Sequence, residues 1–221
     1  MCTIEELNLV FDETGKQFGY LTVRAEFAEM KEFKVKWQRG HDWIDLMIPD
    51  YLEDAPSEVL EDLALSIFSK IDGKERGYGK VMRSFVKDRR FAENNREKYL
   101  KRTGMMMSGP RGEVYDLQEI YEDLVRRGLL DNVKDIHLTW SSDEERPFRI
   151  SALMKVASFS YLMDLRSTPK EVIEVMVYEA VRLIAAGQRD FGKKGGVRND
   201  WVNHPKMHMA MRWVQEKELC F

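Results

Sequence analysis

Residues 175–187 read VMVYEAVRLIAAG, and the helix start STPKE lies just before them at 167–171. This start combines a hydroxyl residue that can cap a helix, a proline inside the first turn and an acidic side chain. The pattern predicts a helix from Thr168 to about Ala186, with Gly187 as its end. Apolar residues recur along it at helical spacing, so we expect this helix to be a core element of its domain.

The composition is typical of a globular protein. A chain of 221 residues, 43% of them apolar and 33% charged, suits one large domain or two small ones. The net charge of −3 argues against a dedicated nucleic-acid binder. No apolar run approaches the about 20 residues of a membrane span, and the acidic N-terminus is unlike a signal peptide, so no membrane partner is expected. Cys2 and Cys220 form no zinc spacing, which favours a reduced, cytoplasmic protein.

The first half of the chain is expected to contain strands followed by a helix. Apolar and lysine residues alternate from Phe33 to Trp37, a pattern typical of a half-buried strand. A second apolar stretch spans 43–52, and the sequence APSE at 55–58 starts a helix. Strands and helices in this order predict an α+β fold.

The second half repeats this order. It has a helix at 115–130, a strand IHLTW at 136–140, and an apolar segment at 149–160 that reads as one extended stretch or two short ones. The helix starts also resemble each other, because APSEVLE begins at Ala55 and TPKEVIE at Thr168, each after a strand ending in Trp. One interpretation is that the first half is a divergent copy of the second. The other is that both contain common helix-start residues.

A basic segment ends the first half, and a linker follows it. Lys and Arg outnumber Asp and Glu between residues 80 and 102, and RTGMMMSGPRG follows with the glycines and proline of a linker. The predicted organisation is therefore an N-terminal α+β half at 1–102, a linker at 103–114 and a second domain at 115–221.

The order of elements in the second half resembles the SprT-like and YgjP-like zincin metallopeptidases. In that family a proline-started helix carries the motif HExxH, and a third zinc ligand lies downstream. Here the downstream segment that is similar is Asn203-His204-Pro205-Lys206. The resemblance covers about residues 115–213 and implies a zincin-like fold for the C-terminal domain.

Applied residue by residue, the resemblance places Tyr178, Glu179 and Arg182 at the motif positions. Two histidines one helical turn apart share a zinc ion, and the glutamate between them acts as the general base. Arg182 offers no lone pair to a metal, and Tyr178 would bind only as a phenolate, whose formation normally requires a pH near ~10. The resemblance therefore implies a site without zinc, in which Arg182 pairs with Glu179. The alternative is an ordinary helix with a polar stripe.

Three functions remain open from the sequence. The first is a catalytically inactive zincin-like protein without a cofactor, which binds a protein or peptide, or acts in assembly, beside Tyr178, Glu179 and Arg182, with Asn203 and His204 as further binding residues. The second is a zinc metallopeptidase with a non-standard ligand set, which the family resemblance and the spacing of the histidines assign to His204, His208 and Glu179.

The third function is nucleic-acid binding through the basic segment 80–102. Its aromatic residues Phe85, Phe91 and Tyr99 would stack on bases while the cations contact phosphate. The alternative for this segment is a solvated charged helix.

Overall fold

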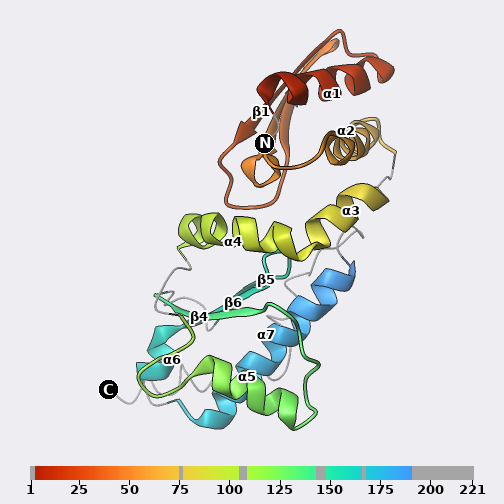
Figure 1. Ribbon diagram of the computed structural model, residues 1–221. Coiled ribbons are helices and arrows are strands. Elements are labelled where there is room, and N and C mark those ends of the chain that lie inside the picture. Colours follow the sequence, from red (N-terminus) through yellow and green to blue (C-terminus); the bar gives the residue numbers. More distant parts are fainter. Residues whose placement is uncertain (1–2, 75–76, 105–108, 143–147, 166–167, 191–221) are drawn as a thin grey trace. The chain divides into compact units, whose positions relative to one another are not determined.

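The computed structural model describes residues 3–74, 77–104, 109–142, 148–165 and 168–190 (Figure 1). These residues form a mixed α+β structure with two three-stranded sheets, which confirms the predicted fold class. The chain divides into two compact units between Phe91 and Ala92. This division lies inside a helix and before the predicted linker at 103–114.

The first unit is built on a sheet whose last strand in sequence is its central strand. β3 pairs parallel with β1 on one side and antiparallel with β2 on the other. The elements are α1 (Ile4–Gln17), β1 (Thr22–Ala28), β2 (Lys36–Arg39), β3 (Trp43–Pro49), the 3₁₀ helix η1 (Asp50–Leu52), α2 (Ser57–Ile71) and α3 (Lys80–Lys87).

Alternation along β3 explains the core of the first unit. Ile44, Leu46 and Ile48 are almost fully buried, whereas Trp43 and Met47 on the opposite face are substantially exposed. Helices α1 and α2 pack against each other, and α1 also packs on β1. Gly15 of α1 permits this close packing, because a Cβ atom there would lie 2.5 Å from Val23 and 3.0 Å from Phe68.

The second unit is also built around its last strand. β6 pairs parallel with β4 and antiparallel with β5. The core between this sheet, α5 and α7 includes Trp140, Phe148 and Phe159. The elements are α4 (Arg89–Thr103, belonging to this unit from Ala92), α5 (Leu117–Arg126), β4 (His137–Ser141), β5 (Phe148–Ser151), β6 (Val156–Ser160), α6 (Tyr161–Leu165) and α7 (Lys170–Asp190).

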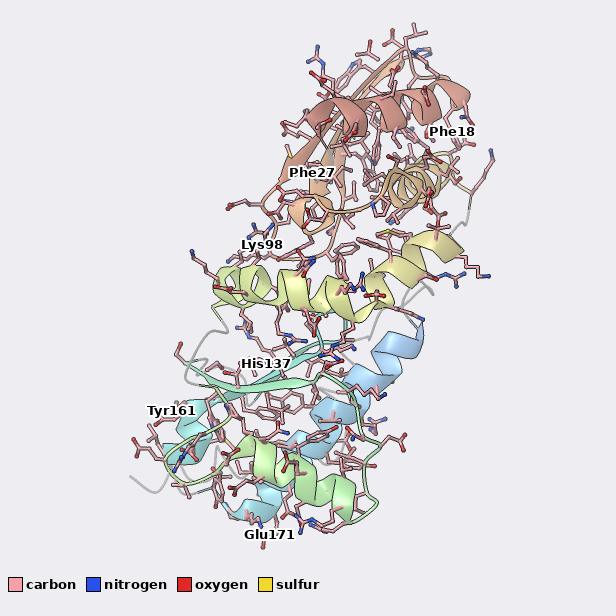
Figure 2. All side chains as sticks on the ribbon, in the orientation of Figure 1. Phe18, Phe27, Lys98, His137, Tyr161 and Glu171 are labelled. Atoms are coloured by element: carbon pink, nitrogen blue, oxygen red, sulfur yellow. The ribbon has the colours of Figure 1, made fainter. Side chains whose placement is uncertain are left out.

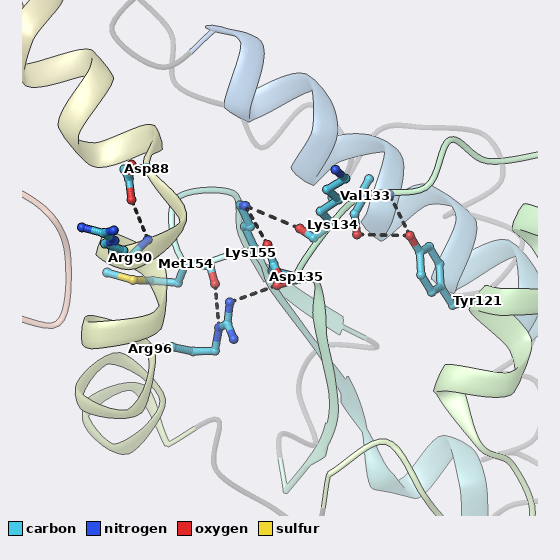
Figure 3. A network of polar contacts seen from close by, with 9 residues as sticks. All are labelled: Asp88, Arg90, Arg96, Tyr121, Val133, Lys134, Asp135, Met154 and Lys155. Atoms are coloured by element: carbon cyan, nitrogen blue, oxygen red, sulfur yellow. Dashed lines mark hydrogen bonds and ion pairs between the residues drawn. The ribbon is translucent and has the colours of Figure 1, made fainter.

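Helix α4 lies on the face of this sheet opposite to α5 and α7 (Figure 1). Arg96 fixes it there by donating from Nε to the carbonyl oxygen of Met154 at 3.1 Å and from Nη2 to that of Asp135 at 3.0 Å (Figure 3). The second sheet is therefore enclosed between helices on both faces within its own unit.

The two units share one topology. From α1 to α2 in the first unit, and from α5 to α7 in the second, the elements run helix, strand, strand, strand, short helix and long helix. Helix α3 follows this series in the first unit and α4 precedes it in the second. Each sheet has the order first, third, second. The starts of β3 and α2 are separated by the same number of residues as the starts of β6 and α7. The sequence match between the helix starts at Ala55 and Thr168 therefore lies at equivalent positions of two similar units.

The structure corrects the matching of the strands that precede those helices. The segment KVKW ends inside β2, which is antiparallel to β3 and is therefore the counterpart of β5. The counterpart of HLTW in β4 is β1, since both are the parallel partners of the central strand. Alternation in a sequence indicates a strand without indicating its partner or direction, which explains the error.

The predicted bounds of α7 also require correction. The helix begins at Lys170, and the carbonyl oxygen of Pro169 accepts the first hydrogen bonds from Val172 and Ile173. The Thr168 hydroxyl is buried and has no hydrogen-bond partner among the described residues, so it is not the cap. Gly187 does not end the helix, which continues to Asp190. A glycine inside a helix costs only about 1 kcal/mol relative to alanine, too little to force an end.

The apolar segment 149–160 forms two strands, β5 and β6, rather than one. None of the helices in the described part of the chain is both long and apolar enough to cross a membrane.

Candidate functional site

Three of the residues singled out from the sequence, Tyr178, Glu179 and Arg182, lie on α7, outside the positions that fill the core. Core positions recur along the helix at intervals of three and four residues, as expected for one buried face. They are Ile173, Met176, Val177, Ala180, Val181 and Ile184. Tyr178, Glu179 and Arg182 occupy the remaining circumference of the helix.

Arg182 pairs with Glu179, as the sequence predicted. Its Nη2 and Nε atoms both donate to Oε2 of Glu179, at 2.8 and 3.0 Å. The carboxylate side chain is only 4% exposed, whereas the arginine side chain is 46% exposed. A buried carboxylate is costly unless a cation and hydrogen bonds compensate it, and Arg182 supplies both to Glu179.

Tyr178 has a different environment. Its side chain is half-buried and packs against the core of the second unit. The structure therefore brings Glu179 and Arg182 together as a polar pair, and places Tyr178 at the margin of the core. This packing accounts for an aromatic residue at the position.

The described residues around Glu179 do not fit a zinc ion. The Oε2 atom of Glu179 is already bound to a guanidinium group, and Arg182 adds a positive charge next to it. Throughout the described residues, no group of three His, Cys, Asp or Glu side chains is arranged to hold a metal. Asn203, His204 and His208 lie outside the described residues, so the predictions for them remain untested.

The aromatic residues of the basic segment are largely used in packing. Phe91 is only 4% exposed, and its ring meets Phe85 and Phe33 in edge-to-face contacts with centroids 5.6 and 5.7 Å apart. A buried ring cannot stack on a base. Several cations of the segment are exposed, but Arg96 is bound to backbone carbonyls of its own unit.

A second polar site, not anticipated from the sequence, centres on Asp164 of α6. This fully buried carboxylate accepts hydrogen bonds from the backbone N–H groups of Glu113, Val114 and Tyr115. Glu113 and Val114, at the end of the predicted linker, are therefore held in place by this carboxylate. In the sequence, Asp164 is a single acidic residue within YLMDL. The neighbouring residues do not indicate that its partners are the N–H groups of residues 113–115.

Further contacts hold the loop of residues 112–115 against α6 and the start of α7. A Cβ atom on Gly112 would lie 2.4 Å from Oδ2 of Asp164, so only glycine allows the loop to approach so closely. The Tyr161 hydroxyl lies 3.2 Å from Oε1 of Glu113 and donates to it. The Tyr115 hydroxyl donates to the carbonyl oxygen of Thr168 at 2.5 Å, which ties the same loop to the start of α7.

A third polar cluster surrounds Arg96 at the end of the second sheet. Asp135 and Lys155 both adopt left-handed backbone conformations, with φ of 62° and 52°. The nearby His137 is half-buried (Figure 2). Burial lowers the pKa of His137 below its ordinary value, and the positive charge of Arg96 lowers it further. The neutral imidazole is therefore favoured in this cluster.

Comparisons of this chain with protein-family models, with curated proteins and with solved structures give no match.

Proposed function

We propose that this chain is a catalytically inactive relative of the SprT-like zincins that binds a protein or peptide beside α7. The observation that carries the proposal is the ion pair between Glu179 and Arg182. In the family that the sequence resembles, the two positions around that glutamate hold a metal cation. Here a guanidinium group supplies the positive charge, and it brings no water for activation.

The electrostatics explain why a chain without zinc would keep this glutamate. A buried carboxylate left without a cation would be destabilising, and a covalently attached cation removes any dependence on metal supply. Both Arg182 contacts also occupy Oε2 of Glu179, so this oxygen atom is already engaged and is not free to orient a water molecule. The site therefore supports binding or assembly better than hydrolysis.

The fold supplies coarser support. The described part of the second unit has a helix, a mixed three-stranded sheet and then a long helix, in the order that the resemblance implies. We infer that the first unit is a divergent copy of it, on the basis of the shared strand order and the equivalent helix starts. Ser66 and Ser69 occupy the positions that correspond to Glu179 and Arg182, and the Ser66 hydroxyl donates to the carbonyl oxygen of Asp62 at 2.7 Å. Neither of these two serines is a residue of the zinc-binding motif.

Metal analysis and restoration of the motif test the loss of catalysis together. The untagged protein should contain no stoichiometric zinc and show no cleavage that a chelator abolishes. The double variant Tyr178→His and Arg182→His should gain zinc affinity, whereas the matched variant Tyr178→Phe and Arg182→Lys should not. Stoichiometric zinc in the unaltered protein, lost on His204→Ala, would overturn the proposal in favour of a peptidase.

A peptide array tests the binding role. Peptides retained by the unaltered protein should bind less to Tyr178→Ala and to Arg182→Ala, while Arg126→Ala, an exposed arginine of α5, should leave them unchanged. Equal retention by all three variants would remove α7 from the binding surface. Nucleic-acid binding through 80–102 has less support, since Phe91 is buried. The absence of a gel shift at low salt would exclude it.

A further inference from the structure

The sheet of the first unit has two edges, β1 and β2, and among the described residues only β1 is closed by a side chain. On β1, the amide of Asn8 bonds both backbone groups of Ala25. Asn8 Nδ2 donates to the Ala25 carbonyl oxygen, and the Ala25 N–H donates to Asn8 Oδ1, both at 2.9 Å. A side chain of α1 thus occupies the place that an added strand would take.

Within the part of the chain that the structure describes, the edge at β2 is open. Gly40 donates its N–H to the carbonyl oxygen of Trp43, and bonded pairs alternate from there along the antiparallel register with β3. Trp37 and Arg39 consequently direct their backbone N–H and C=O groups away from β3. Among the described residues, none supplies a backbone partner for this outer side. All four residues of β2 are exposed.

Two half-exposed tryptophans flank this edge, one on each face of the sheet. Trp37 is 39% exposed on the face of Leu46, and the Nζ atom of Lys70 lies 5.7 Å from its ring centroid. Trp43 is also 39% exposed, and its indole covers Gly40 so closely that a Cβ atom there would overlap it. Indole groups beside an open strand edge are typical anchors for a bound chain.

The charge beside this edge is positive. Lys31, Lys34 and Lys36 are exposed and form no ion pair with any described residue, and Glu32 is the only acidic residue between them. Lysine on a short edge strand discourages pairing with neutral or basic strands. The same lysines attract an acidic strand, so they select the partner rather than close the edge.

We propose that the open edge of β2 is a docking site for an extended acidic segment of a partner protein, which adds to the sheet as a fourth strand. Backbone hydrogen bonds to Trp37 and Arg39 supply affinity, the lysines select acidic side chains, and the indoles of Trp37 and Trp43 cover the bound segment from the two faces. This site lies in the first unit and does not depend on the function proposed for α7.

The test uses a fluorescein-labelled peptide of alternating Glu and Val, with two companions and the full-length protein. One companion has the same sequence with alternate backbone nitrogens methylated, which removes strand pairing while keeping the charge. The other replaces Glu with Lys. The Glu peptide should bind in fluorescence anisotropy, more weakly at higher salt, and should change the tryptophan emission. The methylated and Lys peptides should bind at least about tenfold more weakly.

Matched variants assign the site. Lys34→Glu with Lys36→Glu should weaken binding of the Glu peptide by about tenfold or more, because like charges would then face each other. Lys80→Glu with Arg83→Glu makes the same change of charge on α3 and should leave binding unaltered. Trp37→Ala should weaken binding at unchanged charge, and circular dichroism checks that each variant is folded. No binding of the Glu peptide, equal binding of its methylated form, or an equal effect of the α3 variant would each overturn the proposal.

Discussion

The Nη2 atom of Arg182 lies 2.8 Å from Oε2 of Glu179, a side chain that is almost wholly buried. Removing the cation in Arg182→Met should lower the free energy of unfolding by about 1–2 kcal/mol, because an uncompensated carboxylate then stays in the protein. This value is below the about 3–5 kcal/mol lost when a fully buried pair is broken, because solvent reaches the arginine. Urea unfolding measures the change.

Two further variants isolate the pair. Adding Glu179→Gln to Arg182→Met should recover part of the loss, since the buried charge is gone as well. Arg126→Met, which breaks an exposed pair with Asp123, should change stability by less than about 0.5 kcal/mol. If the double variant lost as much stability as Arg182→Met and Glu179→Gln lose together when measured separately, charge compensation would not be the role of Arg182.

The loop around Asp164 gives a second prediction. Asp164→Asn replaces an acceptor oxygen with an NH₂ group facing backbone N–H donors, so unfolding should become easier by about 2–3 kcal/mol. Gly112→Ala inserts a Cβ atom against the same carboxylate and should be destabilising too. Because both changes disrupt one contact, their effects should add incompletely in chemical denaturation. This account would be contradicted if the two losses of stability were additive, or if Asp164→Asn caused no loss. Asp72→Asn, a change at an exposed aspartate, is the control and should leave the stability nearly unchanged.

A third prediction concerns pH. The pKa of His137 is lowered in the folded state, first by burial and then by Arg96, from an ordinary value of 6.5. Below that pH the unfolded chain binds the proton more readily than the folded one, so stability falls as the pH drops through the folded-state pKa. Unfolding midpoints should therefore decrease below pH 6.5, and less so in His137→Gln. His41→Gln, a change at an exposed histidine, is the control and should leave the pH dependence unchanged. If the unfolding midpoint of His137→Gln depended on pH as steeply as that of the unaltered protein, the prediction would be wrong.

Asn8 gives a fourth prediction, on association. Asn8→Ala frees both backbone groups of Ala25 and should lower stability by about 1–2 kcal/mol. It should also promote concentration-dependent self-association through the freed β1 edge, measured by light scattering. Glu13→Ala, an exposed change on the same helix, should do neither. A monomeric Asn8→Ala protein at high concentration would show that the edge has another protection.

Local patterns predicted the elements more successfully than their pairing. The start of α2 was anticipated from proline and acidic residues, and its apolar positions Leu60, Leu63 and Ala64 are buried as the helical spacing requires. Pairing was misjudged, because KVKW and HLTW look alike although one strand is antiparallel to its neighbour and the other parallel. Strand direction depends on contacts far apart in the sequence, which a local pattern does not contain.

The candidate site was predictable to the same local extent. Arg182 and Glu179 are three residues apart on one helix, so their contact follows from helix geometry. Asp164 binds N–H groups about fifty residues earlier in the chain, and Arg96 binds carbonyls further along it. In both cases the partner is a backbone group. Nearly every residue carries the same backbone groups, so the sequence does not mark which residue is the partner.

In each unit the central strand is the last of the three strands to be synthesised, since β3 follows β1 and β2, and β6 follows β4 and β5. A nascent chain that has emerged only as far as Arg39 contains two strands with no hydrogen-bonding partner between them. The sheet can close only once Trp43–Pro49 has left the ribosome. Truncations that end before β3 or before β6 should therefore leave the strands of that unit unassembled and prone to capture by chaperones.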